Sequence, residues 1–327
     1  MKMKALAAVV AAIPLIVSCG SNKTAEVKDT FALNAAGATF PAPLYVRWFK
    51  DFNVKTGNRV NYQAVGSGTG VRQYKAKNVD FGASDGVVKD SKKPDFGLIH
   101  IPMIGGAIVP AYNMPGCDVK MTQTQLADVF LGKINNWSTF GCDDKQITTV
   151  WRADGSGTTK GFTNSLSAFS PEWKAKVGTG KSVKWPVGIG GKGNSGVAAA
   201  IKVRTGTIGY LNYGYVVGNK FQEVLLQNHD GFYVKANSKT SSTGLSKIVL
   251  DDELRGADPN PVGENSYPIV SLTWVLAYPE SKPGVKETLL YMLSEEAQGI
   301  SDSLGYVPLP ETLRQKSLDA VESLREV

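Results

Sequence analysis

Short apolar runs alternate with amphipathic stretches along the chain from Phe31 onwards, and glycine-rich turns separate them. The segments VNYQAV and VDFGAS have the length and the β-branched or aromatic content of strands. In TQTQLADVFLGKINNW, the spacing of Leu126, Val129 and Phe130 places them on one face of a helix, with Thr124 as its expected N-cap. Strands that alternate with helices predict an α/β fold.

Two apolar runs are longer than the rest, HIPMIGGAIVPAYN and YPIVSLTWVLAY, and both favour long strands. A later stretch, KPGVKETLLYMLSEEAQGI, predicts one amphipathic helix. The chain has 327 residues, of which 42% are hydrophobic and 20% are charged. That length and composition are sufficient for two domains with cores of their own.

The first residues have the layout of a secretory signal. MKMK is positively charged, ALAAVVAAIPLIV is an apolar run of 13 residues, and SCGS follows. The run is shorter than the stretch of about 20 apolar residues that a transmembrane helix needs. We expect residues 1–18 to be a signal peptide and the polar residues 19–30 to be a flexible tether. Removal of Lys2 and Lys4 with the signal lowers the formal charge from +7 to +5.

The residues Ile16-Val17-Ser18-Cys19 resemble a bacterial lipobox, with Ile at a place where Leu is commonest. This resemblance implies cleavage before Cys19, which would then carry a lipid and anchor the protein to a bacterial membrane. An ordinary signal peptide with an incidental cysteine is the alternative.

The positive net charge suits an anionic partner, such as a small oxyanion or a membrane surface. The basic residues are scattered along the chain, without a basic tract or a stripe of basic and aromatic residues. This distribution argues against a nucleic-acid partner.

The remaining cysteines, Cys117 and Cys142, lie beside the turn sequences NMPGCD and TFGCDD. In an oxidising compartment a disulfide between them is expected, whereas two unpaired thiols would indicate a reducing one. His100 and His229 stand alone in the sequence. We therefore interpret both histidines as structural and expect no metal site.

The stretch AKVGTGKS, residues 175–182, fits a loose nucleotide-binding P-loop. A P-loop needs a buried strand before its glycines and a helix directly after its Lys-Ser. Here the polar SPEWKAK precedes and the strand-like VKWPVG follows, and Ala175 stands where the first glycine belongs. The later KIVLDDE could hold magnesium in such a site, but it also fits a helix that continues into LRG. The sequence therefore argues against an ATPase.

Three turns rich in glycine or hydroxyl side chains open predicted helices. They contain Thr39 before Pro41, Ser67 in VGSGTG, and Ser156 in RADGSGTT. A helix N-terminus presents free backbone N–H groups and a partial positive charge, so it favours anions. One such turn is commonly a helix cap without a ligand, whereas three of them favour an oxyanion site.

Several long motifs, in one order, give the chain a resemblance to a known family. AGATFPAPLYVRW, VNYQAVGSGTGV, VDFGASD, RADGSGTT, VGTGKSVKWPVGIGGKGNSGVAA and GTIGYLNYGY closely resemble the phosphate-binding protein of the bacterial phosphate-specific ABC transporter. The resemblance runs from Leu33 to the C-terminus and is loosest at residues 222–265. By this resemblance, VGTGKSVKWPVG is a segment of a binding protein and not a nucleotide loop.

The fold implied by the resemblance is an α/β periplasmic-binding-protein clamshell, in which two domains joined by two crossover strands close on one ligand. Residues 31–106 and 270–327 would then form domain I, and residues 107–269 would form domain II. The crossover strands are expected in the two long apolar runs, near Gly105–Ala111 and Ile269–Leu276.

The resemblance also implies the ligand and its contacts. Carried over position by position, inorganic phosphate would be bound by Ala38, Thr39, Phe40, Ser67, Asp85, Arg152, Ser156, Gly157 and Thr158. The chain departs from the family at Gly68-Thr69, where Ser-Gly is commoner.

The residue types suit this ligand. Arg152 offers a fixed fork of donors to two phosphate oxygens, and Asp154 is expected to hold that guanidinium in place. The alternative for Asp154 is that it merely caps the next helix. Asp85 would repel an anion unless the anion carries a proton. Phosphate at neutral pH keeps an O–H, from which Asp85 can accept a hydrogen bond, whereas sulfate has no O–H.

The implied function is that of an exported, lipid-anchored and monomeric receptor, in the periplasm or at the cell surface. It would deliver phosphate to a membrane permease that works with a cytoplasmic ATPase. No cofactor and no covalent chemistry are expected, because the site has no nucleophile with a base beside it. The alternatives are a phosphatase, a receptor for another oxyanion such as sulfate or molybdate, and a surface adhesin or signalling lipoprotein that has kept the fold.

Overall fold

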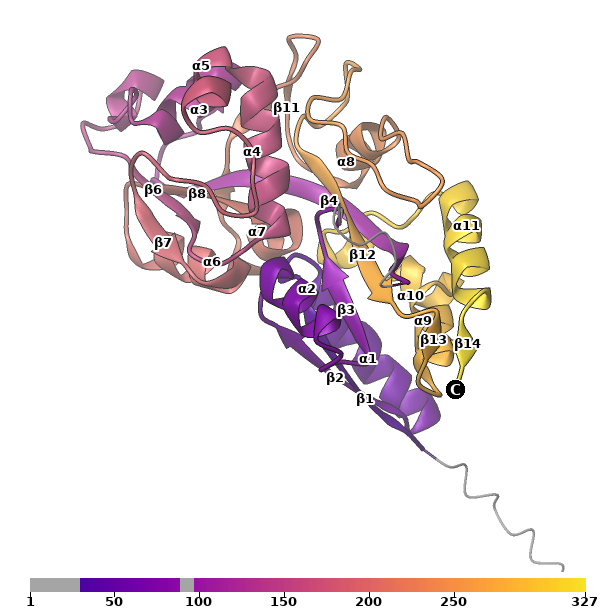
Figure 1. The fold of residues 1–327 in the computed structure, drawn as a ribbon. Coiled ribbons are helices and arrows are strands. Elements are labelled where there is room, and N and C mark those ends of the chain that lie inside the picture. The colour runs from indigo at the N-terminus through magenta and orange to yellow at the C-terminus, as the bar shows by residue number, and fades with distance from the viewer. Residues whose placement is uncertain (1–29, 89–96) are drawn as a thin grey trace, which may run out of the picture.

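The computed structural model describes residues 30–88 and 97–327 (Figure 1). The predicted signal peptide, Cys19 and nearly all of the predicted tether lie outside the described residues. The described chain forms two lobes. One lobe holds the indigo N-terminal strands and the yellow C-terminal helices, and the other holds the magenta and pink middle of the chain.

A nine-stranded sheet runs through both lobes. Its order is β2-β1-β3-β12-β4-β8-β6-β7, and β9 pairs with β4 off this path. These strands are β1 (Ala32–Gly37), β2 (Arg59–Ala64), β3 (Phe81–Ser84), β4 (Ile99–Asn113), β6 (Thr148–Arg152), β7 (Ile189–Gly191), β8 (Thr207–Asn212), β9 (Gln222–Glu223) and β12 (Val270–Ala277). The smaller sheets contain β5 (Lys120–Met121), β10 (Leu225–Gln227) and β11 (Tyr233–Val234), and β13 (Glu280–Ser281) with β14 (Arg325–Glu326).

Strand β4 connects the two lobes. Its residues 99–107 pair antiparallel with β12 in the first lobe, and its residues 108–113 pair antiparallel with β8 in the second lobe. Every residue between its two ends is buried, and so is all of β12, which explains why both segments are unbroken apolar runs. The two runs are thus neighbouring strands at the junction of the lobes, which confirms the predicted crossover strands and clamshell fold.

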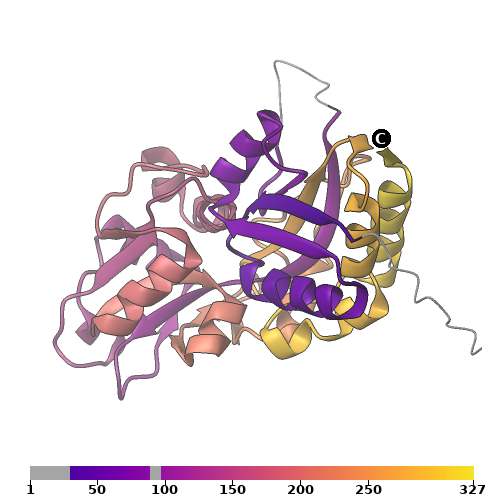
Figure 2. The same cartoon turned by 90° about the horizontal axis from the view of Figure 1, so that it is seen from below.

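Helices flank the sheet in both lobes. The first lobe has α1 (Ala42–Thr56), α2 (Ser67–Lys75), α9 (Val285–Met292), α10 (Glu295–Gly299) and α11 (Glu311–Glu322). The second lobe has α3 (Gln123–Leu131), α4 (Gly157–Phe169), α5 (Pro171–Lys176), α6 (Gly193–Val203) and α7 (Tyr213–Asn219). Helix α8 (Ser238–Leu245) packs against both β4 and β12, and η1 (Trp137–Phe140) and η2 (Asp302–Leu304) are short 3-10 turns. Figure 2 shows α1 and α2 on opposite sides of the indigo strands.

The N-cap of α3 differs from the predicted one. Thr122, not Thr124, caps this helix, because the Thr122 hydroxyl accepts from the backbone N–H of Gln125 and the Gln125 side chain accepts in return. The predicted core face of α3 is buried, and it consists of Leu126, Val129 and Phe130.

Two further predictions of helices need correction. The single helix predicted near the C-terminus is broken into α9 and α10, because Ser294 caps a new helix by accepting from the N–H of Ala297. Residues 247–253, for which both a strand and a helix were considered, form neither. In the P-loop-like stretch, Ala175 and Lys176 end α5 and no helix follows until α6, so the structure agrees with the rejection of a nucleotide loop.

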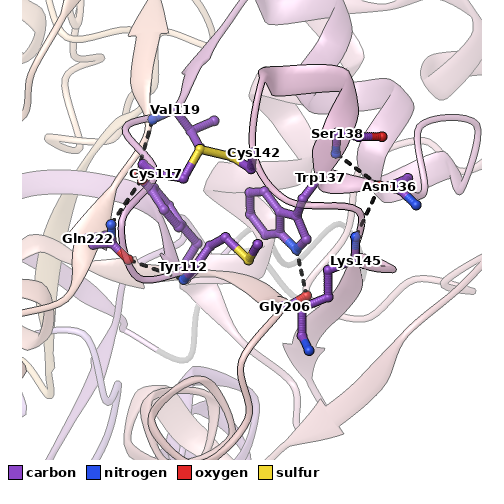
Figure 3. The surroundings of a disulfide bond; sticks show 11 residues. Tyr112, Cys117, Val119, Asn136, Trp137, Ser138, Cys142, Lys145, Gly206 and Gln222 are labelled. Atoms are coloured by element: carbon purple, nitrogen blue, oxygen red, sulfur yellow. Dashed lines mark hydrogen bonds between the residues drawn. A yellow bond between two sulfur atoms is a disulfide. The ribbon is translucent and has the colours of Figure 1, made fainter.

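The predicted disulfide is confirmed: Cys117 and Cys142 are bonded, with their Cα atoms 5.5 Å apart (Figure 3). It ties the turn after β4 to the loop after η1, across a sequence separation of 25 residues. The carbonyl of Cys117 also accepts hydrogen bonds from Tyr112 Oη at 2.9 Å and from Gln222 Nε2 at 3.0 Å. By chain entropy, a closed loop of this length contributes about 3 kcal/mol of stability.

The segment between α8 and β12 contacts both lobes. Trp274 of β12 donates through its indole N–H to the carbonyl of Leu254 at 2.7 Å. Asn260 exchanges hydrogen bonds with Gln123 of α3, which belongs to the second lobe. The boundary of domain II at residue 269 therefore stays a prediction.

Candidate functional site

The candidate site lies where the lobes meet, beyond the C-terminal ends of three strands. The turn with Thr39 follows β1, Asp85 directly follows β3, and Arg152 ends β6. Since β1 and β3 are parallel neighbours, their turns come out at the same edge of the sheet. Helices α2 and α4 begin at the same place, with Ser67 and Ser156. We call the buried residues gathered here the candidate anion site: Ala38, Thr39, Phe40, Ser67, Asp85, Arg152, Ser156, Gly157 and Thr158.

Hydrogen bonds link members of the candidate anion site across the two lobes. The Thr158 hydroxyl donates to Asp85 Oδ2 at 3.3 Å, and Ser67 Oγ lies 3.5 Å from the same oxygen. Asn194 Nδ2 donates to Thr39 Oγ1 at 2.9 Å and to Thr158 Oγ1 at 3.3 Å. Of these contacts, the Thr158–Asp85 and Asn194–Thr39 bonds join the second lobe to the first at two points of the site, so the lobes are closed.

Glycines permit this close approach of the lobes. A Cβ on Gly157 would lie 2.7 Å from the Cβ of Asp85, which is too short for two carbon atoms. The backbone N–H of Gly68 donates to the carbonyl of Gly155 at 2.7 Å. Side chains at these positions would hold the lobes apart.

Arg152 and Asp154 form the ion pair of the site. Nε and Nη2 of Arg152 donate to Asp154 at 2.8 and 2.6 Å, and Nη1 donates to Thr158 Oγ1 at 3.3 Å. Burial raises the pKa of Asp154, but the hydrogen bonds and charge of Arg152 and the N–H of Gly193 outweigh burial and lower that pKa below its usual value. Ser156 is the residue that caps α4, so Asp154 is left to hold the guanidinium.

Asp85 is buried, whereas Asp154 is half-buried. Its Oδ1 accepts from Thr273 Oγ1 at 2.9 Å, and its backbone carbonyl accepts from Ser271 Oγ at 3.1 Å. Burial raises the pKa of Asp85 to about 6, against the opposing effects of the Thr273 hydrogen bond and the Arg152 charge. A carboxylate that titrates close to neutral pH therefore lies among hydrogen-bond donors.

Tyrosine hydroxyls fix the first turn of the site. The carbonyls of Ala38, Thr39 and Phe40 accept hydrogen bonds of 2.6–2.8 Å from Tyr62, Tyr215 and Tyr306, respectively. Within residues 30–88 and 97–327, the backbone N–H groups of Thr39 and Phe40 have no hydrogen-bond acceptor. Because buried N–H groups in proteins are nearly always paired, this turn offers two donors to a ligand.

Sequence reasoning missed Asn194 and Thr273. Asn194 is buried in the first turn of α6, in the motif GGKGNSGVAA, so the same signal of a glycine turn that opens a helix could have found it. Ser271 and Thr273 are the polar residues of the otherwise apolar β12. Their spacing of two residues places both on one face of the strand, and this pattern could have indicated a polar partner there.

His100 and His229 lie outside the candidate anion site. His100 is buried and accepts from the backbone N–H of Val88 at 3.2 Å, whereas His229 is exposed beside Asp230. Throughout the described residues, no group of three or more His, Cys, Asp or Glu side chains is placed to hold a metal ion. The described helices are also too short or too polar to cross a membrane.

Comparisons with known proteins identify relatives of this chain. Residues 21–296 match the PBP superfamily domain. The phosphate-binding protein PstS of Pasteurella multocida is 37% identical over 322 residues, which cover 88% of this chain and 91% of that protein. The phosphate-binding protein PstS of Methanocaldococcus jannaschii is 32% identical, over 92% of this chain and 88% of that protein.

Solved structures share the fold at low sequence identity. A phosphate-binding protein from Stenotrophomonas maltophilia is 18% identical, with a TM-score of 0.69 over 88% of this chain and 93% of that chain. An ABC-type phosphate transport receptor from Vibrio cholerae is 18% identical, with a TM-score of 0.56 over 85% and 100%. The chain therefore belongs to the PBP superfamily and, within it, to the family of PstS phosphate-binding proteins.

Proposed function

We propose that this protein binds inorganic phosphate between its two lobes and delivers it to the permease of an ABC transporter. The observation that carries the proposal is the buried Asp85 carboxylate among the donors of Arg152, Thr158 and Ser67. Donors alone would suit any small oxyanion. The carboxylate adds an acceptor, which suits an oxyanion that carries a proton, and phosphate at neutral pH does so.

The remaining groups of the site supply donors without a net negative charge. The backbone N–H groups of Thr39 and Phe40 and the N-termini of α2 and α4 favour an anion. Arg152 is held by Asp154 in an orientation that leaves Nη1 directed at the Thr158 hydroxyl of the site. A guanidinium held in this way can bind an oxyanion without a further loss of side-chain entropy.

Two other functions of the same ligand class compete with this one. A receptor for sulfate or molybdate would face Asp85 with an unprotonated oxygen, which the carboxylate repels. A phosphatase would need an activated nucleophile or metal ions, and its relatives would be expected among enzymes. The relatives of this chain are named as binding proteins.

Calorimetric titration of the full chain with phosphate, repeated with sulfate as competitor, tests the proposal. We expect one phosphate per chain and little competition by sulfate. A chromogenic phosphate ester should remain intact in the same preparation. Tight binding of sulfate would contradict the proposed role of Asp85 as an acceptor for a protonated oxyanion. Turnover of the ester would favour a phosphatase.

Export and anchoring complete the proposed role. We infer that the signal peptide is removed and that Cys19 carries the lipid which holds the receptor at a bacterial membrane, outside the cytoplasm. Lipid anchoring is supported by the lipobox alone, because Cys19 lies outside the described residues. The receptor would act as a monomer, with residues 107–269 as the domain that moves against residues 31–106 and 270–327.

A further inference from the structure

Lys181 lies beside the candidate anion site without being a member of it. It belongs to the stretch AKVGTGKS, after α5 in the second lobe. Its ammonium group donates to Ser84 Oγ, at the end of β3 in the first lobe, at 3.2 Å. Its backbone carbonyl accepts from the N–H of Ser156 at 2.8 Å. A single residue thus contacts the turn that carries Asp85 and the turn that opens α4.

Ser84 is placed to accept this bond. Its hydroxyl is fully buried, donates to the carbonyl of Gly86 at 2.6 Å, and accepts from the N–H of Gly86 at 3.2 Å. A hydroxyl has one proton and two lone pairs, so Lys181 occupies the remaining lone pair. Because Ser84 and Gly86 flank Asp85, the lysine acts on the turn that orients the Asp85 carboxylate.

A second lysine from the same lobe covers this turn. Lys160 of α4 donates to the carbonyl of Val87 at 3.1 Å. A Cβ on Gly86 would lie 3.0 Å from Lys160 Cδ and 3.4 Å from Lys181 Cε. The two apolar stems therefore pack over Gly86, while the ammonium groups bond to polar atoms beside it.

Charged groups on three neighbouring elements act on Lys181. Burial and the charge of Lys160 on α4 lower the pKa of Lys181 to about 8, Asp85 after β3 raises it, and Lys75 on α2 lowers it further. The ammonium form still prevails at neutral pH. An anion bound beside Asp85 adds negative charge nearby and favours that form further.

We propose that Lys181 is a positioning residue that latches the closed lobes and so slows release of the bound anion, which it does not touch. The identity of that anion as phosphate rests on the proposed function. A bond that forms only on closure favours the closed state by its own free energy. It therefore acts on the dissociation rate more than on the association rate.

Stopped-flow phosphate binding to Lys181→Met, with Lys184→Met as the matched control, tests the latch. Lys184 is exposed in the same loop, so its removal subtracts the same charge without the contact. We expect Lys181→Met to release phosphate about tenfold faster, near the lower end of what a hydrogen bond from a charged group contributes, with a nearly unchanged association rate. Lys184→Met should behave like the native protein, and Lys181→Arg should restore most of the native rate.

The ratio of phosphate to sulfate affinity separates a latch from a ligand contact. It should be the same in Lys181→Met and the native protein, because both anions depend equally on closure. Equal release rates in Lys181→Met and Lys184→Met, or a changed ratio in Lys181→Met, would overturn the proposal.

Small-angle X-ray scattering without added anion distinguishes failure of the latch from failure of the proposed function. If the native protein binds no phosphate, the proposed function is wrong, and the radius of gyration then decides on the latch. A larger radius in Lys181→Met than in Lys184→Met supports the latch, and an equal radius overturns it. If the native protein binds phosphate, the release rates of the two variants decide whether Lys181 acts as the latch.

Discussion

Asp85 and Asp154 are carboxylates at the junction of the lobes, the first buried and the second half-buried, and their surroundings move their pKa values in opposite directions. Asp154 accepts two hydrogen bonds from the Arg152 guanidinium and one from the N–H of Gly193, and its pKa falls. Asp85 accepts from neutral hydroxyls, chiefly that of Thr273, and its pKa rises to about 6.

The comparison assigns the two carboxylates different parts in the same site. The charge of Asp154 is neutralised by Arg152, so this carboxylate positions a cation and faces no ligand proton. The charge of Asp85 is only partly compensated, so this carboxylate is free to respond to a proton that a ligand brings. Affinity should then depend on the Asp154 side of the site, and discrimination between anions on the Asp85 side.

Arg152→Ala should have the largest effect, because it removes the cation that acts on both carboxylates and leaves the half-buried Asp154 without its partner. We expect phosphate and sulfate binding to weaken alike, by about 3–5 kcal/mol. Calorimetric titration with both anions measures the loss. A loss confined to phosphate would mean that Arg152, rather than Asp85, discriminates between the anions.

Asp85→Asn should lower the phosphate-to-sulfate ratio by about a hundredfold, a part of the discrimination that a mispaired buried group can provide. The amide oxygen can still accept a hydrogen bond from the phosphate O–H, so phosphate binding should weaken only modestly. Sulfate no longer meets a buried carboxylate and should bind better. Competition titrations give the ratio of phosphate to sulfate affinity. An unchanged ratio would show that Asp85 does not recognise the proton of phosphate.

The same substitution should stabilise the anion-free protein at neutral pH. Asp85 loses its proton near pH 3.8 when unfolded and near pH 6 when folded, so the folded state holds more protons between these values and the wild type loses stability as the pH rises through them. Above pH 6, Asp85→Asn should be more stable than the wild type by about 3 kcal/mol. Denaturant unfolding at pH 4 and pH 7.5 should show this difference only at the higher pH.

Asp154→Asn should have the smallest effect. Three donors point at the carboxylate, and an amide turns its own N–H₂ toward one of them, which loosens Arg152. We expect both anions to bind about tenfold more weakly, the cost of one charge-assisted hydrogen bond, with the ratio between them unchanged. A changed ratio of phosphate to sulfate affinity in Asp154→Asn would show that Asp154 also contributes to discrimination between the anions.

Much of the fold followed from the sequence pattern because its signals are local or repeated. The two unbroken apolar runs predicted β4 and β12, because a strand that is buried on both faces is apolar at nearly every position. The break between α9 and α10 did not follow, because the apolar spacing continues across Ser294 and only the cap ends the helix. Thr124 was predicted as the N-cap of α3 in place of Thr122, because both are hydroxyl residues at the start of one apolar pattern.

The candidate site was predictable where a turn opens a helix, as at Ser67 and Ser156. Asn194 and Thr273 act through contacts with residues 155 and 188 positions away in the chain, and such pairings have no local signature. Lys181 illustrates another limit. Its stretch was set aside with the nucleotide loop, although the lysine itself reaches across the lobes.

Strand β12 lies between β3 and β4 in the sheet, but it is the last of the three to be made, because it begins at residue 270. As the chain emerges N-terminus first, β3 and β4 are present for the whole time in which the second lobe is synthesised, each with an edge that lacks its partner. The strands β6, β7 and β8 and the part of β4 that pairs with β8 are already complete, so the second lobe can fold first. The sheet of the first lobe is complete only on arrival of β12, so the open edges of β3 and β4 need protection from aggregation until then.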